Sequence, residues 1–383
     1  MEGRAAYFRR WLARRGPVSV AAFMAEALGH PRYGYYQSGA PFGAAGDFIT
    51  APEISQMFGE LIGLWLAQCW RDRGAPGRFI LLEAGPGRGV LMADILRATR
   101  AVPGFHRAVR VHLLETSAPL RALQRRQLAD AGVPLRWHDR LATVPGGLPL
   151  YLVANEFFDA LPVRQFVRQA GSWRERLVTL DAHGDPVFTL SRHAVAAARL
   201  PLDPARPARP GDIVETRPAA VRLAAFLGRR IARHDGAGLV LDYGHDGAGS
   251  GDSLQAVRDH AAAPVLARPG EADLTAHVDF AALAAAFGRG GATAAPLRGQ
   301  GAFLDALGIR VRAAALLRSA GPDQARQIRT ALHRLTAPGE MGVLFKALGL
   351  RAPGSPELPG LPSVPACRPP APPPAPDLPA GSG

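Results

Sequence analysis

Short apolar runs alternate with longer amphipathic segments through the middle of this 383-residue chain. Most apolar runs are followed by a segment whose apolar residues recur at helical spacing. This alternation predicts an α/β fold with a doubly wound, mostly parallel sheet. Strands are predicted at 79–83, 109–115, 135–138, 150–154, 238–244 and 341–348. Helices are predicted at 90–100, 117–130, 219–233, 273–288 and 322–335.

The two ends of the chain and one internal segment depart from this alternation. The first 75 residues predict mostly helices, because Pro17 with Ser19 and Pro52 with Glu53 are typical of helix starts. Strand-like pieces between residues 165 and 190 indicate an antiparallel insertion. The expected regions are a helical N-terminal region with a lid loop at 1–75, an α/β domain at 76–350 with an insertion at about 163–225, and a Pro-rich disordered tail at 351–383.

Composition narrows the class of protein. A hydrophobic content of 48% supports a packed core, and no apolar run reaches the length of a membrane span. Cys69 and Cys367 offer neither a disulfide framework nor a zinc spacing, so no metal site is predicted and a reducing cytoplasm fits. The net charge of +13 is almost entirely arginine, scattered without an aromatic platform. We therefore predict no nucleic-acid binding, whereas an acidic protein partner would be attracted.

The most informative motif follows the strand at 79–83, which leads into Glu83-Ala84-Gly85-Pro86-Gly87-Arg88-Gly89. Glycines permit a tight turn and a close ligand approach, and the helix that follows exposes its first N–H groups. A dinucleotide fingerprint would require glycine at Val90, so that fingerprint fails. The spacing instead resembles the first motif of S-adenosylmethionine (SAM) methyltransferases. The predicted SAM-binding residues are Glu83, Gly85, Pro86, Gly87, Gly89 and, at the end of the next strand, the ribose-binding acid Glu115. A tight turn without a ligand is the alternative.

Further candidate site residues follow other predicted strands or lie in the loop before the first long helix. Ligands of doubly wound sheets bind beyond the carboxyl ends of the strands, where Asp139 would meet the adenine and Asn155 the methyl side. In the loop before the first long helix, Asp47 or Thr50 would bind the methionine end of the cofactor, and Glu53 would join a substrate clamp. The alternative is that Thr50 and Glu53 form a helix capping box.

Two acids follow the strand at 150–154. Glu156 and Asp159 share a face if this segment turns helically, and two carboxylates facing one pocket repel each other. A cationic substrate removes that cost, and arginine matches a carboxylate with two parallel hydrogen bonds. We predict that Glu156, Asp159 and Glu53 hold a guanidinium while its far nitrogen lines up with the sulfonium methyl group. Alternatively, Asn155 or Asp159 caps a turn and Glu156 is solvated.

Beyond single motifs, the chain resembles the MidA-like methyltransferases, which include the mitochondrial complex I assembly factor that dimethylates arginine. The resemblance covers residues about 10–350. The matching segments are 30–36, 46–56, 83–89, 155–162, 254–258, 272–280, 300–304 and 341–346.

This resemblance implies a class I SAM-dependent protein-arginine methyltransferase that modifies a peripheral-arm subunit of complex I. Because no presequence precedes the family's first helix, a bacterial cytoplasmic protein is expected rather than a mitochondrial one. A homodimer is left open. The alternatives are an assembly chaperone that keeps a SAM-binding fold without catalysis and a dinucleotide-dependent oxidoreductase.

Overall fold

The computed structural model describes residues 3–37, 50–202, 207–247 and 251–363. Its largest sheet has the strand order β15-β17-β10-β5-β2-β3-β4, with β14 and β16 attached to β10 and β17. The bounds are β2 Phe79–Ala84, β3 Val109–Leu114, β4 Leu135–His138, β5 Leu150–Asn155, β10 Ala237–His245, β14 Val278–Asp279, β15 Thr293–Ala294, β16 Arg298–Gly299 and β17 Phe345–Arg351. Neighbours from β10 to β4 are parallel, and β17 is antiparallel. The predicted α/β class with a mostly parallel sheet is confirmed.

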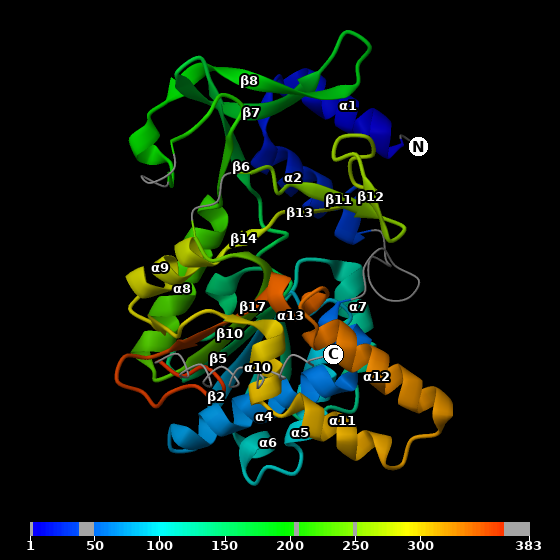
Figure 1. The fold of residues 1–383 in the computed structure, drawn as a ribbon, viewed down its shortest axis with the longest axis vertical. Coiled ribbons are helices and arrows are strands. Elements are labelled where there is room, and N and C mark those ends of the chain that lie inside the picture. Colours follow the sequence, from blue (N-terminus) through cyan, green and yellow to red (C-terminus); the bar gives the residue numbers. More distant parts are fainter. Residues whose placement is uncertain (1–2, 38–49, 203–206, 248–250, 364–383) are drawn as a thin grey trace, which may run out of the picture.

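Helices cover both faces of this sheet, so its central strands are buried on both sides. Leu81 packs with α4, α5 and α11 on one face, whereas its neighbour Leu82 packs with α8 and α9 on the other. The helices of the described residues are α1 Arg4–Arg15, α2 Val20–Gly29, α3 Ala51–Ile54, α4 Gln56–Asp72, α5 Val90–Thr99, α6 Phe105–Ala108, α7 Ala118–Gln127, α8 Pro218–Arg233, α9 Phe280–Arg289, α10 Gln300–Ala306, α11 Ile309–Leu317, α12 Pro322–Thr336 and α13 Met341–Leu344. Figure 1 shows these layers, with α8 and α9 on the opposite side from α11 and α12.

The inserted strands form a second, antiparallel sheet at the other end of the molecule (Figure 1). It consists of β6 Arg164–Gln169, β7 Ser172–Leu180, β8 Pro186–Val195, β9 Ile213–Thr216 and, from the N-terminal region, β1 Val18–Ser19. A small sheet of β11 Gln255–Arg258, β12 Ala261–Ala263 and β13 Asp273–Thr275 lies below it. Phe8 and Phe23 of the first two helices share one apolar cluster with Val178 and Leu274 of these sheets. The predicted domain boundaries stay a prediction.

Local polar contacts overrule several predicted element boundaries. The helix predicted from residue 273 begins at Phe280, because the Asp279 carboxylate accepts the N–H of Ala282 at 2.9 Å and caps the helix. Residues 273–275 form β13 instead. The helix opened by Pro52 stops after one turn, and Ser55 caps α4 by accepting the N–H of Met57. The last strand begins at Phe345, after a helical turn.

The predicted disordered tail starts too early. Residues 352–363 lie on the body, with Leu358 and Leu361 buried against the main core. Trp65 Nε1 donates to the carbonyl of Pro359 at 3.0 Å, and Arg298 donates to that of Gly360 at 2.6 Å. The prediction of disorder is therefore wrong for 352–363. Residues 364–383 lie outside the described residues.

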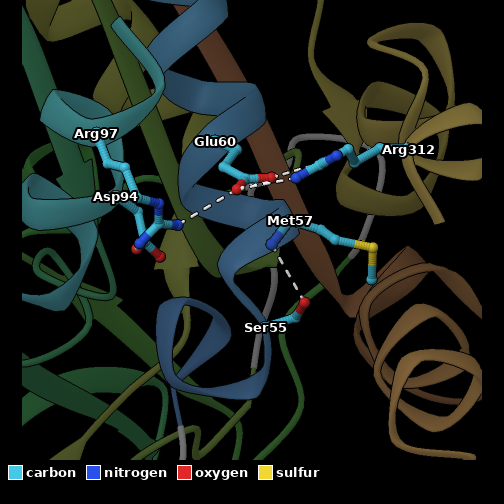
Figure 2. A network of polar contacts seen from close by, with 6 residues as sticks. All are labelled: Ser55, Met57, Glu60, Asp94, Arg97 and Arg312. Carbon is cyan, nitrogen blue, oxygen red and sulfur yellow. Dashed lines mark hydrogen bonds and ion pairs between the residues drawn. The ribbon is translucent and has the colours of Figure 1, made fainter. Parts of the chain in front are cut away.

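An ion network joins α4 to α5 and α11 through Glu60 (Figure 2). Glu60 accepts from Arg312 Nε of α11 at 2.8 Å and from Arg97 of α5 at 3.3 Å. Arg97 also pairs with Asp94 at 2.7 Å. Because one carboxylate joins three helices, α4 is held in place with respect to the sheet and to α11.

Candidate active site

Two adjoining cavities lie beyond the carboxyl ends of β2, β3 and β5. The larger cavity, of about 410 Å³, is lined by Ala25, Leu28, Gly29, Tyr36, Gly85, Gly87, Leu114, Glu115, Thr116, Leu120, Asp139, Leu141, Glu156, Phe157, Ala160, Leu161, Pro162 and Leu223. The smaller cavity, of about 50 Å³, is lined by Thr50, Pro52, Glu53, Glu83, Gly85, Pro86, Gly87, Arg88, Val90, Leu91, Asn155 and Glu156. Gly85, Gly87 and Glu156 belong to both, so the cavities meet at the glycine turn.

The glycine turn between β2 and α5 can be made only with small residues. Gly85, Gly87 and Gly89 have φ values of 68°, 51° and 85°, in the region that glycine occupies without strain. A Cβ atom on Gly85 would lie 2.7 Å from Cδ2 of Phe157. The turn thus brings bare backbone to the wall of both cavities, where a ligand can approach closely.

At the smaller cavity, Oε2 of Glu83 and Oδ1 of Asn155 are buried and accept no hydrogen bond from the described residues. Buried acceptors without a donor are costly, so a ligand that brings N–H groups fits them. Burial, with a further contribution from Glu115, raises the pKa of Glu83 to about 8. An ammonium group such as that of the methionine end of SAM would satisfy both oxygens.

Glu115 lies just beyond β3 and lines the larger cavity. Its Oε1 accepts the N–H of Ser117 at 2.7 Å, and its Oε2 accepts from Gln124 Nε2 at 3.2 Å. Burial raises the pKa of this carboxyl group. The carboxylate also lines the larger cavity, where it can receive hydroxyl groups of a ribose. The residues present therefore fit the nucleoside part of SAM.

The N-terminal region supplies part of the cavity wall. Tyr36 lines the larger cavity, and its backbone carbonyl accepts the hydroxyl of Ser117 at 2.6 Å. Its own hydroxyl donates to Asp273 at 2.9 Å. The segment that precedes the α/β fold is consequently tied both to α7 and to β13, and it closes the cavity from the side of α2.

Glu156 occupies the meeting point of the two cavities in an unusual backbone conformation. Its φ is 48°, which is uncommon for a residue other than glycine, and its N–H donates to the carbonyl of Leu241 at 2.8 Å. Its Oε1 accepts from the Ala51 N–H and from Asn155 Nδ2, both at 3.1 Å. Burial, followed by the charge of Asp159, raises the pKa of Glu156 to about 8.

The other predicted acids differ in their position relative to the two cavities. Glu53 lines the smaller cavity beside Glu156 and lies 3.5 Å from Arg88. Asp159 lines neither cavity, because its Oδ1 accepts the N–H of Ala160 at 2.8 Å and its carboxylate is hydrogen-bonded to Tyr243. Asp139 lines the larger cavity, but its side chain is 62% exposed.

Thr50 and Asp47 were predicted at the methionine end. Thr50 lines the smaller cavity and directly precedes α3. Its side chain makes no capping hydrogen bond to this helix, so the alternative of a capping box with Glu53 is not formed. Asp47 lies outside the described residues.

Asp242, which is not among the predicted site residues, is the acid that shapes this turn. Asp242 lies within β10 and is fully buried. Its Oδ2 accepts the successive N–H groups of Phe157, Phe158 and Asp159 at 3.2, 2.9 and 3.2 Å, and its Oδ1 accepts that of Tyr243. An acid inside a buried apolar strand was the available signal.

Arg217, before α8, completes the support and is not among the predicted site residues either. It donates to the carbonyls of Phe158, Asp159 and Leu161 at 3.1–3.2 Å and to that of His277 at 2.7 Å. No pattern around Arg217 in the sequence indicates this role, because its partners are backbone atoms of distant segments.

Two further observations concern chemistry outside these cavities. Among the described ranges, no three His, Cys, Asp or Glu side chains are grouped closely enough to hold a metal ion. None of the described helices has the length and apolar character to cross a bilayer.

Comparison with known proteins agrees with this geometry. A model of a SAM-dependent methyltransferase family matches residues 61–296. "Protein arginine methyltransferase NDUFAF7, mitochondrial" of Mus musculus is 38% identical in an alignment of 361 positions that covers 88% of this chain and 81% of that protein. The Homo sapiens protein of the same name is also 38% identical, over 88% of this chain and 80% of its own length.

A solved structure has the same fold over nearly the whole chain. It is a COG1565 superfamily member from Burkholderia thailandensis bound to S-adenosyl-homocysteine, with a TM-score of 0.81 and 30% identity, covering 94% of both chains. SAM is therefore the cofactor, and the predicted cofactor is confirmed. The chain belongs to the MidA-like family of class I SAM-dependent methyltransferases.

Proposed function

We propose that this enzyme transfers the methyl group of SAM to an arginine guanidinium of a protein, with a subunit of respiratory complex I as the target. The observation that carries the proposal is the Glu156 carboxylate, buried at the meeting point of the two cavities with Glu53 beside it. The relatives named as protein arginine methyltransferases support the same reaction. The bacterial cytoplasmic location predicted from the sequence is part of this proposal.

The two cavities divide the work of binding. Glu115 would hold the ribose in the larger cavity, and Asp139 would contact the adenine near its mouth. Glu83, Asn155, Thr50 and the turn from Gly85 to Gly89 would hold the methionine end in the smaller one. When bound, SAM supplies an electrophilic methyl group on a sulfonium sulfur.

Glu156 and Glu53 would then orient the acceptor. A guanidinium stays protonated at ordinary pH, so its nitrogens are weak nucleophiles until the charge is held at one end. Two neighbouring carboxylates can hold the positive charge at one end of the group, and the bound cation relieves their mutual repulsion. Burial raises the pKa of Glu156 to about 8 in the empty site, and the charge of an arriving guanidinium favours its ionised form. Methyl transfer from SAM would release one N–H proton of the guanidinium, and this carboxylate could accept it. Asp159, behind Glu156, would stabilise the cation from a distance.

The decisive variant is Glu156→Gln, which keeps the shape and removes the charge. Affinity for SAM should stay nearly unchanged, whereas methyl transfer should fall by about 10²-fold or more, as expected for the loss of a charged positioning contact. Glu271→Gln, the same change at a partly exposed ion pair with Arg258, is the matched control and should transfer at the wild-type rate.

The assay is transfer of labelled methyl groups to a recombinant peripheral-arm subunit of complex I, followed by peptide mapping. A wild-type rate for both Glu156→Gln and Asp159→Asn would show that these acids do not position the acceptor. Label on lysine, or on a small molecule, would refute the substrate class. Tight SAM binding without any labelled protein would favour the non-catalytic chaperone.

A further inference from the structure

Gln124 of α7 is a buried polar side chain whose every hydrogen-bonding group is used. It is 0% exposed. Its Nε2 donates to the Gly87 carbonyl at 2.7 Å and to Glu115 Oε2 at 3.2 Å, while its Oε1 accepts the indole N–H of Trp137 at 2.8 Å. One amide therefore joins the glycine turn, the ribose-binding acid and strand β4.

The orientation of this amide is determined by its partners. An indole N–H can only donate, so the atom that faces Trp137 must be Oε1. Nε2 consequently faces Glu115 and Gly87, which present acceptor oxygens. Trp137 lines neither of these cavities, and its indole N–H reaches the candidate site through its hydrogen bond to Gln124.

The Glu115 carboxylate is held from two sides by this arrangement. Ser117 binds Oε1 and Gln124 binds Oε2, so the plane of the carboxylate cannot rotate without the loss of one hydrogen bond. Its remaining lone pairs then have fixed directions at the wall of the larger cavity. A ribose diol needs such a carboxylate with both oxygens in place, and preorganisation lowers the cost of binding.

We propose that Gln124 is a positioning residue for the cofactor, which fixes the Glu115 carboxylate in the geometry that receives the ribose. The proposal rests on SAM dependence and is independent of the methyl acceptor. It predicts that the contribution of Gln124 to cofactor affinity is delivered through Glu115.

The test is a double-mutant cycle measured by calorimetry with S-adenosylhomocysteine as the probe. Gln124→Met keeps the size of the side chain and removes its hydrogen bonds, and we expect affinity to fall about 10-fold or more. In a Glu115→Gln background the same change should cost about threefold or less, because the group that Gln124 positions is already altered. Equal losses in both backgrounds, or wild-type affinity for Gln124→Met, would overturn the proposal.

Two further variants separate positioning from a general loss of packing. Gln300→Met, at a buried glutamine of α10 whose Nε2 donates to the Leu335 carbonyl, is the matched control and should leave affinity unchanged. If it weakens binding as much as Gln124→Met, the effect is not specific and the proposal fails. Should Gln124→Met not fold, Trp137→Phe replaces it in the cycle: a loss of about threefold is expected with Glu115 present and none with Glu115→Gln. The same loss in both backgrounds would again refute the role of Gln124.

Discussion

The segment after β17 gives a prediction that depends on packing alone. Leu358 and Leu361 are 3% and 1% exposed, and their Cδ1 atoms reach the space in which Gly349 of β17 has no side chain. A Cβ atom on Gly349 would lie 2.6 Å from each of them. The two leucines thus close the main core beside α4, so we expect Leu361→Ala to destabilise the whole α/β fold.

The magnitude follows from the nature of the site. Replacing a fully buried leucine with alanine costs about 2–5 kcal/mol, because the transfer free energy of the lost atoms is added to that of the cavity left behind. Leu361 lies at the end of a segment that is also held by the Trp65 and Arg298 hydrogen bonds, which limits its collapse into the cavity. We expect a loss in the upper half of that range, with a fall in Tm of roughly 2 °C per kcal/mol for a chain of this size.

Thermal and urea unfolding of three variants would check this reasoning. Leu361→Ala and truncation after Arg351 should both lower Tm, whereas truncation after Ser363 should leave it unchanged. Exposed Val311→Ala is the matched control for the loss of apolar atoms and should have almost no effect. If truncation after Arg351 gives a wild-type Tm, the segment does not stabilise the core and the packing argument is wrong.

Two other predictions concern the site. Asp242→Asn replaces one of two acceptor oxygens with an NH₂ group, so the four backbone N–H groups that Asp242 receives cannot all keep an acceptor and the turn that carries Glu156 should relax. Methyl transfer should fall by about 10²-fold, with S-adenosylhomocysteine affinity changed only a few-fold; transfer near the wild-type rate would contradict this role. Glu83 has a folded-state pKa raised from 4.5 to about 8, so the folded protein binds the proton more tightly and the stability of the cofactor-free enzyme should fall as pH rises from about 5 to 8. Glu83→Gln should flatten that dependence of Tm on pH, and an unchanged slope would assign it to other groups.

Much of the lining of the candidate site could be predicted because its motifs are local in sequence. The turn from Gly85 to Gly89 needs positive φ at fixed spacing, and Glu115 needs only to follow the next strand. Both conditions can be read from one chain without knowledge of packing. The strands that precede these residues are equally predictable, since a strand buried on both faces is apolar along most of its length.

The failures have the opposite character, because each depends on contacts between distant residues. Periodicity extended the helix at 280 back to 273, but the Asp279 cap and the pairing of β13 with β11 decide otherwise. The composition of residues 352–363 predicts disorder, yet Leu358 and Leu361 are buried against Gly349, a contact between distant residues that the sequence does not indicate. Likewise the spacing of Glu156 and Asp159 suggested that both face one pocket, whereas Glu156 lines both cavities and Asp159 lines neither.

The electrostatic design of the turn explains why those carboxylates can be buried at all. Asp242 is compensated by four backbone N–H groups, and Asp159 by Tyr243 and the nearby charge of Arg217. Arg217 donates its hydrogen bonds to backbone carbonyl groups. It therefore holds the turn without forming a direct ion pair with Asp159 or Asp242. Glu156, which faces the cavities, receives one backbone N–H and one amide and keeps a pKa of about 8. Burial raises the pKa of all three acids, but Glu156 alone among them lines the cavities, so it is the acid that a cation arriving with the substrate can stabilise.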